Sequence, residues 1–160
     1  NLCVLCRFPA PSGCDAFRSA PVHTPQRERT QQFLHRMNVV EETITSRDFD
    51  FIGINTRIEE FGRAFLMDQK TIIGAQTILE ELCVQKLLPC FDENVDMRVT
   101  LEYSEKTTHA QMRVFYNCDF DFDENSDDLS SVLIRRVAFE IERFHPEEGG
   151  YSSCIEIKLK

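Results

Sequence analysis

The sequence predicts an α+β fold: a two-layer sandwich with one mostly antiparallel sheet and helices on one of its faces. Residues 97–103 and 110–116 alternate apolar and polar side chains and are separated by a short polar stretch, which is typical of a β-hairpin. Residues 50–68 and 70–88 instead place apolar side chains at helical spacing. A last alternating segment covers 154–160. The length of 160 residues fits one domain of ordinary size.

The N-terminal part of the sequence is expected to contain an arm followed by the start of the domain. Residues 1–25 contain four of the six prolines and three cysteines, so we expect an irregular, cysteine-containing arm or linker there. Residues 26–160 are expected to form the domain. Thr24 followed by proline predicts the start of a short polar helix over 24–37. The β-branched residues of 38–46 then predict the first strand.

Two helices should follow this strand. The helix over 50–68 has one apolar side, formed by Ile54, Ile58, Phe61 and Phe65. The second helix runs from about Lys70 and has to end at Pro89, because proline cannot continue the hydrogen-bonding pattern. Its apolar side is formed by Ile72, Ala75, Leu79, Leu82 and Cys83.

After the hairpin, an acidic loop over 118–128 leads to a third helix, predicted over 128–144. Asp127 or Asp128 should cap this helix at its N-terminus. One side of the helix is expected to carry Leu129, Leu133, Arg136, Val137 and Ile141. The terminal strand 154–160 alternates apolar residues with charge, so one of its faces should be covered. The expected order is strand, helix, helix, strand, strand, helix, strand.

Composition excludes several classes of function. The chain has 27 carboxylates against 18 Lys and Arg, which argues against a nucleic-acid partner. No apolar run reaches the roughly 18 residues of a membrane span, so we expect no membrane insertion and a cytoplasmic location. Seven cysteines are an odd number, and Cys83, Cys118 and Cys154 are expected to be small buried apolar side chains. Because the first residue is Asn1, we also expect a longer parent polypeptide with an upstream domain.

The order of elements, the cluster EELCVQ at 80–85 and the acidic loop before the third helix resemble the histidine-kinase-like ATPase (GHKL, or Bergerat) superfamily. Within it, the chain is most similar to anti-sigma-factor serine kinases, whose corresponding helix has the form EELxxN. The resemblance covers about residues 39–160 and lies mainly in 54–85, the hairpin and 116–136. It implies a nucleotide site for ATP and Mg²⁺, and it allows a homodimer, since relatives commonly pair through their first strand and helix.

The resemblance assigns roles to individual residues. Glu81 would be the catalytic carboxylate that polarises the attacking water, with Glu80 as a neighbouring candidate. Gln85 stands where the family has the asparagine that helps to hold Mg²⁺. In the acidic loop, Asp119 or Asp121 would accept a hydrogen bond from the adenine amino group. The family's phosphate-binding turn before the last helix corresponds to DDLSSVLI, which makes Ser130 and Ser131 candidates for nucleotide binding.

Three departures from the family pattern predict a degenerate site. Gln85 is one methylene longer than asparagine, which moves its oxygen away from the metal position. The loop after Tyr116 lacks the glycines that let backbone approach a nucleotide, because none occurs between Gly74 and Gly149. The aspartates of DDLSSVLI place negative charge where phosphate would bind. We therefore expect a regulatory or protein-interaction domain, with an active ATP- and Mg²⁺-dependent serine kinase as the alternative.

Two segments of the sequence contain side chains of the kinds that bind metal ions. Cys3, Cys6, Cys14 and His23 have the ligand types of a four-coordinate Zn²⁺ site, although their spacing does not match a paired zinc knuckle, and an ordinary reduced arm is favoured. The alternating aspartates of 118–128 resemble the start of a calcium-binding loop, but this loop lacks the required glycine and the final bidentate glutamate.

The arm itself offers a hypothesis about the parent protein. The phrase CRFPAPSGCDAFRSAP, at residues 6–21, resembles the cysteine-bearing tails of peptide-importing ABC transporter ATPase subunits. This similarity implies that the domain is the C-terminal regulatory part of such a subunit in a bacterial transporter, with the upstream domain as its partner.

Overall fold

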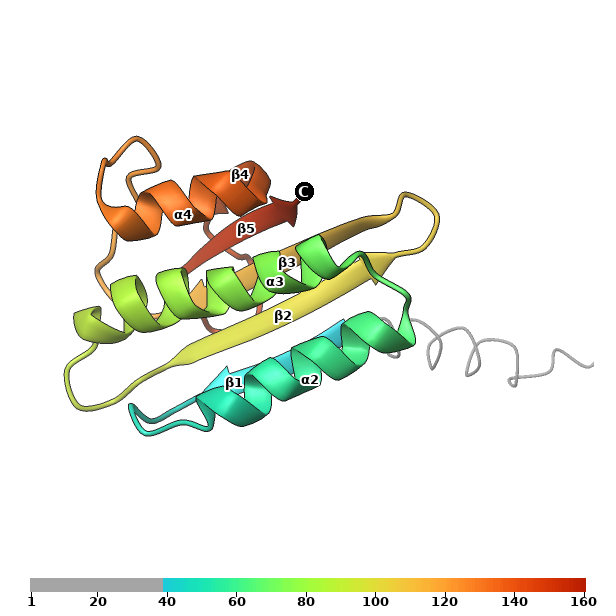
Figure 1. Cartoon of the computed structure of the whole chain (residues 1–160). Coiled ribbons are helices and arrows are strands. Elements are labelled where there is room, and N and C mark those ends of the chain that lie inside the picture. Colours follow the sequence, from blue (N-terminus) through green and yellow to red (C-terminus); the bar gives the residue numbers. More distant parts are fainter. Residues whose placement is uncertain (1–38) are drawn as a thin grey trace, which may run out of the picture.

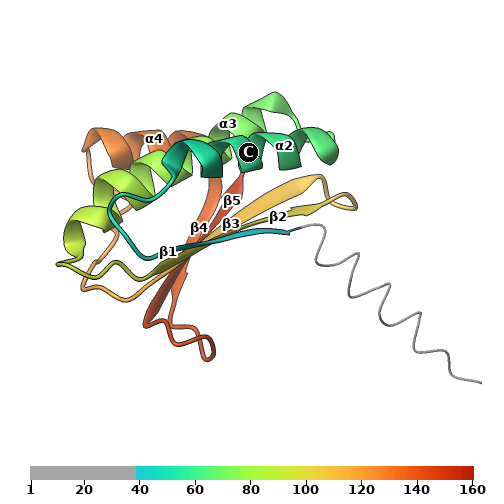
Figure 2. The same cartoon turned by 90° about the horizontal axis from the view of Figure 1, so that it is seen from below.

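The computed structural model describes residues 39–160, which form an α+β sandwich. Five strands make one antiparallel sheet in the order β1-β2-β3-β5-β4. Helices α2, α3 and α4 all lie on one face of this sheet, and no helix of residues 39–160 lies on the other face (Figures 1 and 2). The predicted fold class is confirmed. The expected arm over 1–25 and helix over 24–37 lie outside the described residues.

The strands are β1 (Val39–Ile44), β2 (Met97–Ser104), β3 (His109–Tyr116), β4 (Ala138–Phe144) and β5 (Ser153–Leu159). Their alternating sequences fix which side chains face the helices. Leu101 on β2, Met112 on β3 and Ile157 on β5 lie side by side across the sheet and are nearly inaccessible to solvent. The predicted hairpin and terminal strand are therefore confirmed.

The helices are α2 (Phe51–Ala64), α3 (Gln69–Ile78) and α4 (Leu129–Val137). The side chains of Asp50 and Asp68 accept hydrogen bonds from backbone N–H groups in the first turns of α2 and α3, which satisfies donors that have no partner within the helix. Gly62 on α2 lies so close to Ile72 on α3 that an added Cβ would be 2.4 Å from the Ile72 side chain. This close approach explains the glycine.

The helix that was expected to run to Pro89 changes its geometry after Ile78. Residues Leu79–Leu87 form a π-helix, η1, and Leu88–Cys90 form a 3-10 turn, η2. A π-helix hydrogen-bonds each residue to the fifth along, so it is wider than an α-helix; it is rare and frequently occurs at functional sites. Its inner side chains, Leu79, Leu82, Cys83 and Leu87, are fully buried.

The third helix was predicted too long. It ends at Val137, and residues 138–144 continue directly as the strand β4. Ile134 is buried there, whereas Leu129 at the start of the expected apolar side is 73% exposed. Residues 138–144 contain apolar side chains that fit either structure, and pairing with β5 decides in favour of the strand. The order thus gains one strand at the edge of the sheet.

Candidate functional site

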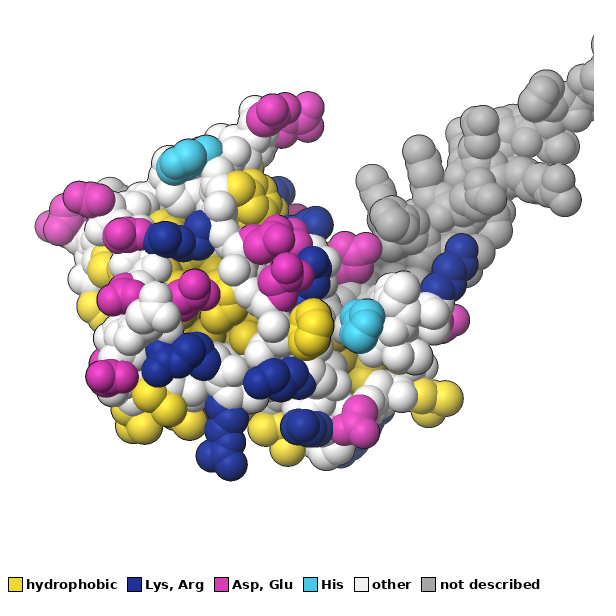
Figure 3. Space-filling view, turned by 90° about the horizontal axis from the view of Figure 1, so that it is seen from above, with side chains coloured by type: hydrophobic (Ala, Val, Ile, Leu, Met, Phe, Trp, Pro, Cys, Tyr) yellow, Lys and Arg dark blue, Asp and Glu magenta, His cyan; other side chains and the backbone are white. Residues whose placement is uncertain are grey.

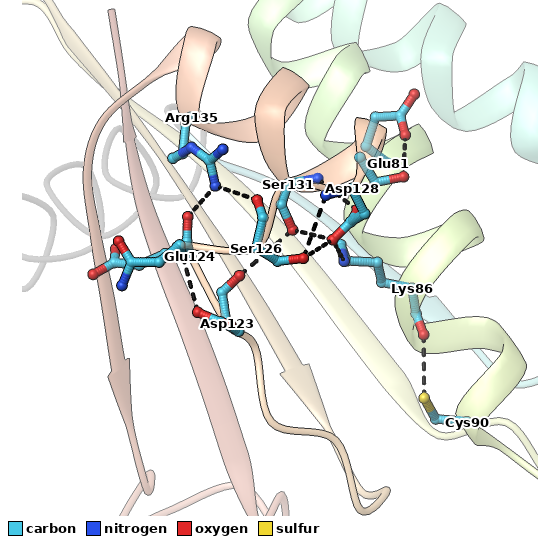
Figure 4. Close-up of polar contacts among 11 residues, drawn as sticks. Glu81, Lys86, Cys90, Asp123, Glu124, Ser126, Asp128, Ser131 and Arg135 are labelled. Atoms are coloured by element: carbon cyan, nitrogen blue, oxygen red, sulfur yellow. Dashed lines mark hydrogen bonds and ion pairs between the residues drawn. The ribbon is translucent and has the colours of Figure 1, made fainter.

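The candidate site lies where η1, the acidic loop and the first turn of α4 meet (Figure 4). The loop comes from the end of β3 and is held to α4 by Arg135. One guanidinium nitrogen of Arg135 donates to the backbone oxygen of Ser126 at 2.7 Å and also to the backbone oxygen of Glu124. These bonds fix the position of the loop beside the helix N-terminus.

Asp128 is the N-cap of α4 and the centre of a small polar network. Its Oδ1 accepts from the backbone N–H of Ser131 at 3.0 Å, and its Oδ2 accepts from the Ser131 hydroxyl at 2.8 Å. The same Oδ2 accepts from the Ser126 hydroxyl at 2.5 Å and from Lys86 Nζ at 2.9 Å. The prediction that one of the two aspartates caps this helix is confirmed for Asp128.

These contacts hold the pKa of Asp128 well below its usual range, chiefly through the Ser126 hydroxyl, then through Lys86 and through the backbone N–H and hydroxyl of Ser131. Asp128 is therefore an anion at every physiological pH. The N-terminal end of α4, where helices favour negative charge, already carries the protein's own carboxylate.

Two of the predicted site residues meet directly. Ser130 Oγ donates to Glu81 Oε2 at 2.6 Å, so η1 and α4 are joined by a second polar contact beside the Lys86–Asp128 pair. Glu80, the neighbouring candidate, is exposed. Ser131 is fully buried, and its hydroxyl is engaged by Asp128.

Gln85 does not share this face. In an α-helix the residue four positions after Glu81 would be its neighbour, but the π-helical geometry of η1 brings the fifth residue, Lys86, to that side. The Lys86 side chain is only 18% exposed and contacts α4 through Asp128, whereas Gln85 is exposed. A lysine therefore occupies the side of the helix on which the resemblance placed a metal ligand.

The two loop aspartates are also separated. Asp121 forms an ion pair with Arg143 on β4 and lines a cavity of about 810 Å³ between the acidic loop and the ends of β4 and β5. Asp119 is exposed and is not among the residues that line this cavity. Phe122 connects the two regions, because Lys86 Nζ lies 5.9 Å from its ring centre and the ring also lines the cavity.

The four cysteines of the described part are unpaired, and three of them are poor nucleophiles. Cys83 and Cys154 are buried, and burial raises the pKa of each thiol to about 12. Burial also raises the pKa of Cys118 to about 11. All three are therefore protonated at neutral pH, which removes the thiolate that nucleophilic chemistry requires.

Among residues 39–160, no group of three or more His, Cys, Asp or Glu side chains is arranged to hold a metal ion. Cys3, Cys6, Cys14 and His23, the candidate Zn²⁺ ligands, lie outside the described residues.

Sequence reasoning missed Lys86, Ser126 and Arg143 as members of these networks. Lys86 was missed because α-helical spacing places Gln85 beside Glu81, and no feature of the sequence LEELCVQKL predicts a π-helix. Arg143 was hidden because its segment was expected to be helical. Ser126 follows the Asx- and Ser-rich pattern of a turn, which was the available signal.

The comparisons with known proteins leave the family open. No protein-family model matches the chain, and the search of curated proteins found no match. Among the described helices, none has the length and apolar character needed to cross a membrane.

Proposed function

We propose that this chain is a degenerate member of the histidine-kinase-like ATPase superfamily that acts as a regulatory or protein-interaction domain of a larger bacterial protein. The single observation that carries this proposal is the internal occupation of the α4 N-terminus. Asp128 accepts hydrogen bonds from the backbone N–H and the hydroxyl of Ser131. A nucleotide phosphate at that position would meet a carboxylate in place of free N–H donors.

The contacts around Asp128 support the same conclusion. Lys86 neutralises Asp128 from η1, and Ser130 is bonded to Glu81, so the groups that would bind phosphate or polarise a nucleophile are bonded to each other. Breaking these contacts would cost the domain part of its own packing between η1 and α4. The site thus favours a structural role for residues that resemble catalytic ones.

The experiment is a thermal melt of the full chain with 5 mM Mg²⁺ and either ATP or ADP at about 5 mM. A ligand present at about 100 times its dissociation constant adds about 2.7 kcal/mol to the stability of the native state. For a domain of this size that shift amounts to several degrees in Tm. We expect no shift for either nucleotide.

The rival function is an active serine kinase that binds ATP and Mg²⁺, and it is favoured by the Asp121-lined cavity in the loop where the resemblance places adenine. A clear rise in Tm with ATP would support nucleotide binding. If Asp121→Ala or Asp119→Ala abolished this rise and Glu81→Ala left it intact, the degenerate-site proposal would be rejected in favour of retained binding.

We further propose a cytoplasmic location and a partner within the same polypeptide or assembly, as in the C-terminal part of an ABC transporter ATPase subunit. The support is that all four cysteines of the described part are free thiols, which suits a reducing compartment. Mass spectrometry of the endogenous protein would test this parentage: peptides of a transporter ATPase subunit in the same polypeptide would support it, and an intact mass equal to that of this chain would overturn it.

A further inference from the structure

Within residues 39–160, strand β4 is an open edge of the sheet. It pairs with β5 on one side and is the last strand in the sheet order. Five of its seven residues are exposed, including Phe139, which is 74% exposed, and Phe144, which is 40% exposed. An exposed edge strand presents unpaired backbone N–H and C=O groups to which another extended chain can bond.

A cavity adjoins this edge on the helix side. Its volume is about 810 Å³, and β4 contributes Ile141, Arg143 and Phe144 to its wall. The opposite wall is the acidic loop, from which Phe120 and Phe122 supply aromatic rings. Figure 3, which looks onto this edge, shows hydrophobic side chains at the bottom of a hollow surrounded by acidic and basic ones.

The charge around the cavity selects the kind of occupant. Arg143 lines it but is paired with Asp121. Asp123 and Glu124 also line it, and among residues 39–160 neither of these two carboxylates takes part in an ion pair. Carboxylates beside aromatic rings favour a cationic side chain, since a guanidinium or ammonium group attracts both.

A second copy of the same strand would fit this edge poorly. Glu140 and Glu142 point to the same face of β4, because both lie opposite residues on the helix-free side of β5. In a two-fold symmetric antiparallel pair of two β4 strands, which keeps the same face of both strands on one side, each register that pairs most of the strand places a glutamate directly opposite a glutamate. Like charges in that position destabilise a sheet, so a basic strand is the better partner.

We propose that the β4 edge and its cavity bind an extended, basic segment of a partner protein. The segment adds a strand to the sheet at β4, and one of its Arg or Lys side chains enters the cavity between Arg143 and the acidic loop. Backbone pairing supplies affinity in this mode, and the cavity supplies selectivity for the side chain. This inference rests on the proposed interaction function and names the partner's chemistry.

The test uses the ¹⁵N-labelled full chain and an acetylated, amidated peptide of sequence Thr-Val-Arg-Val-Lys-Val-Thr. Its matched control carries citrulline and acetyl-lysine at the two basic positions, which removes the charge and keeps the shape. We expect saturable amide shifts confined to β4 and residues 116–125, with binding of the control peptide at least about fivefold weaker. A peptide N-methylated at alternate residues should not bind, since it cannot pair with the edge.

Variants locate the contact. Asp123→Asn combined with Glu124→Gln should weaken the basic peptide about fivefold by removing two cavity carboxylates. Glu59→Gln combined with Glu60→Gln is the matched control. It removes the same charge from α2, which lies over the opposite edge of the sheet, and should leave binding of the basic peptide unchanged (Figure 1).

The inference is overturned if the peptide causes no saturable shifts, if the neutral control binds equally well, or if the shifts map away from β4. Such a result would leave the degenerate-site proposal standing, because that proposal is tested by the nucleotide melt. Conversely, a nucleotide-induced rise in Tm would reject the degenerate-site proposal and would leave the conclusion from the peptide titration unchanged.

Discussion

At the scale of single residues, Asp128 combines a structural and an electrostatic role. It accepts four hydrogen bonds, from two groups of Ser131, from Ser126 and from Lys86. Its lowered pKa means that the folded protein binds this proton less tightly than the unfolded chain, whose aspartate pKa is about 3.9. The stability that Asp128 contributes is therefore fully present above about pH 4 and is lost as the pH falls below that value.

The first prediction at this scale is for Asp128→Asn. Asparagine can still cap α4 but has no charge for Lys86, so we expect Tm at pH 7 to fall by a few degrees. The difference from the wild type should shrink as the pH is lowered from 4 to 2, because the wild-type carboxylate then becomes protonated. Melting curves across this pH range measure both effects. The control is Asp127→Asn, an exposed neighbour outside the network, and an equal loss there would contradict the assignment to Asp128.

At the scale of elements, η1 decides which side chains face α4. Its π-helical geometry places Glu81 and Lys86 on the α4 side and turns Gln85 to solvent. The same nine residues in an α-helix would place Gln85 beside Glu81. Because the hydrogen-bonded turn of a π-helix is one residue longer than that of an α-helix, the cation of Lys86 faces α4 where an α-helix would place the amide of Gln85.

The prediction for this element compares two substitutions of similar shape. Lys86→Met should lower Tm by a few degrees, since it leaves Asp128 without its cation, whereas Gln85→Met should change Tm by less than about 1 °C. Thermal melts at pH 7 in low and high salt provide the measurement. Salt should reduce the difference by screening the Lys86–Asp128 pair. A larger loss for Gln85→Met than for Lys86→Met would contradict the placement of Lys86, and not Gln85, on the α4 side of η1.

At the scale of the whole molecule, the two layers could be predicted because the alternation of apolar and polar residues in strands and the helical spacing of apolar residues are both visible in short stretches of sequence. The β2–β3 hairpin, the two long helices and β5 follow from this. The strand β4 does not, because AFEIERF has no decisive period and its structure is set by pairing with β5, which is distant in sequence. The role of Asp128 could be predicted because it depends on helix capping, which is a local signal. The roles of Lys86 and Arg143 could not, because they depend on the π-helix and on the strand β4.

The pairing of β4 with β5 gives the last prediction. Ile141 on β4 lies directly opposite Ile157 on β5, but Ile157 is fully buried between β3 and β4 while Ile141 is partly exposed at the sheet edge. Ile157→Ala should lower the free energy of unfolding by about 2–5 kcal/mol, because it removes buried methyl groups and leaves a cavity. Ile141→Ala, the same change on the same face, should cost less than about 2 kcal/mol.

Urea unfolding of the two variants measures this difference directly. If 138–144 were helical, as the sequence pattern suggested, Ile141 would lie on the apolar side of α4 and its truncation would be as costly as that of Ile157. Equal losses would therefore argue against the strand. A small loss at Ile141 would fit an edge strand that keeps its outer side available to a further strand.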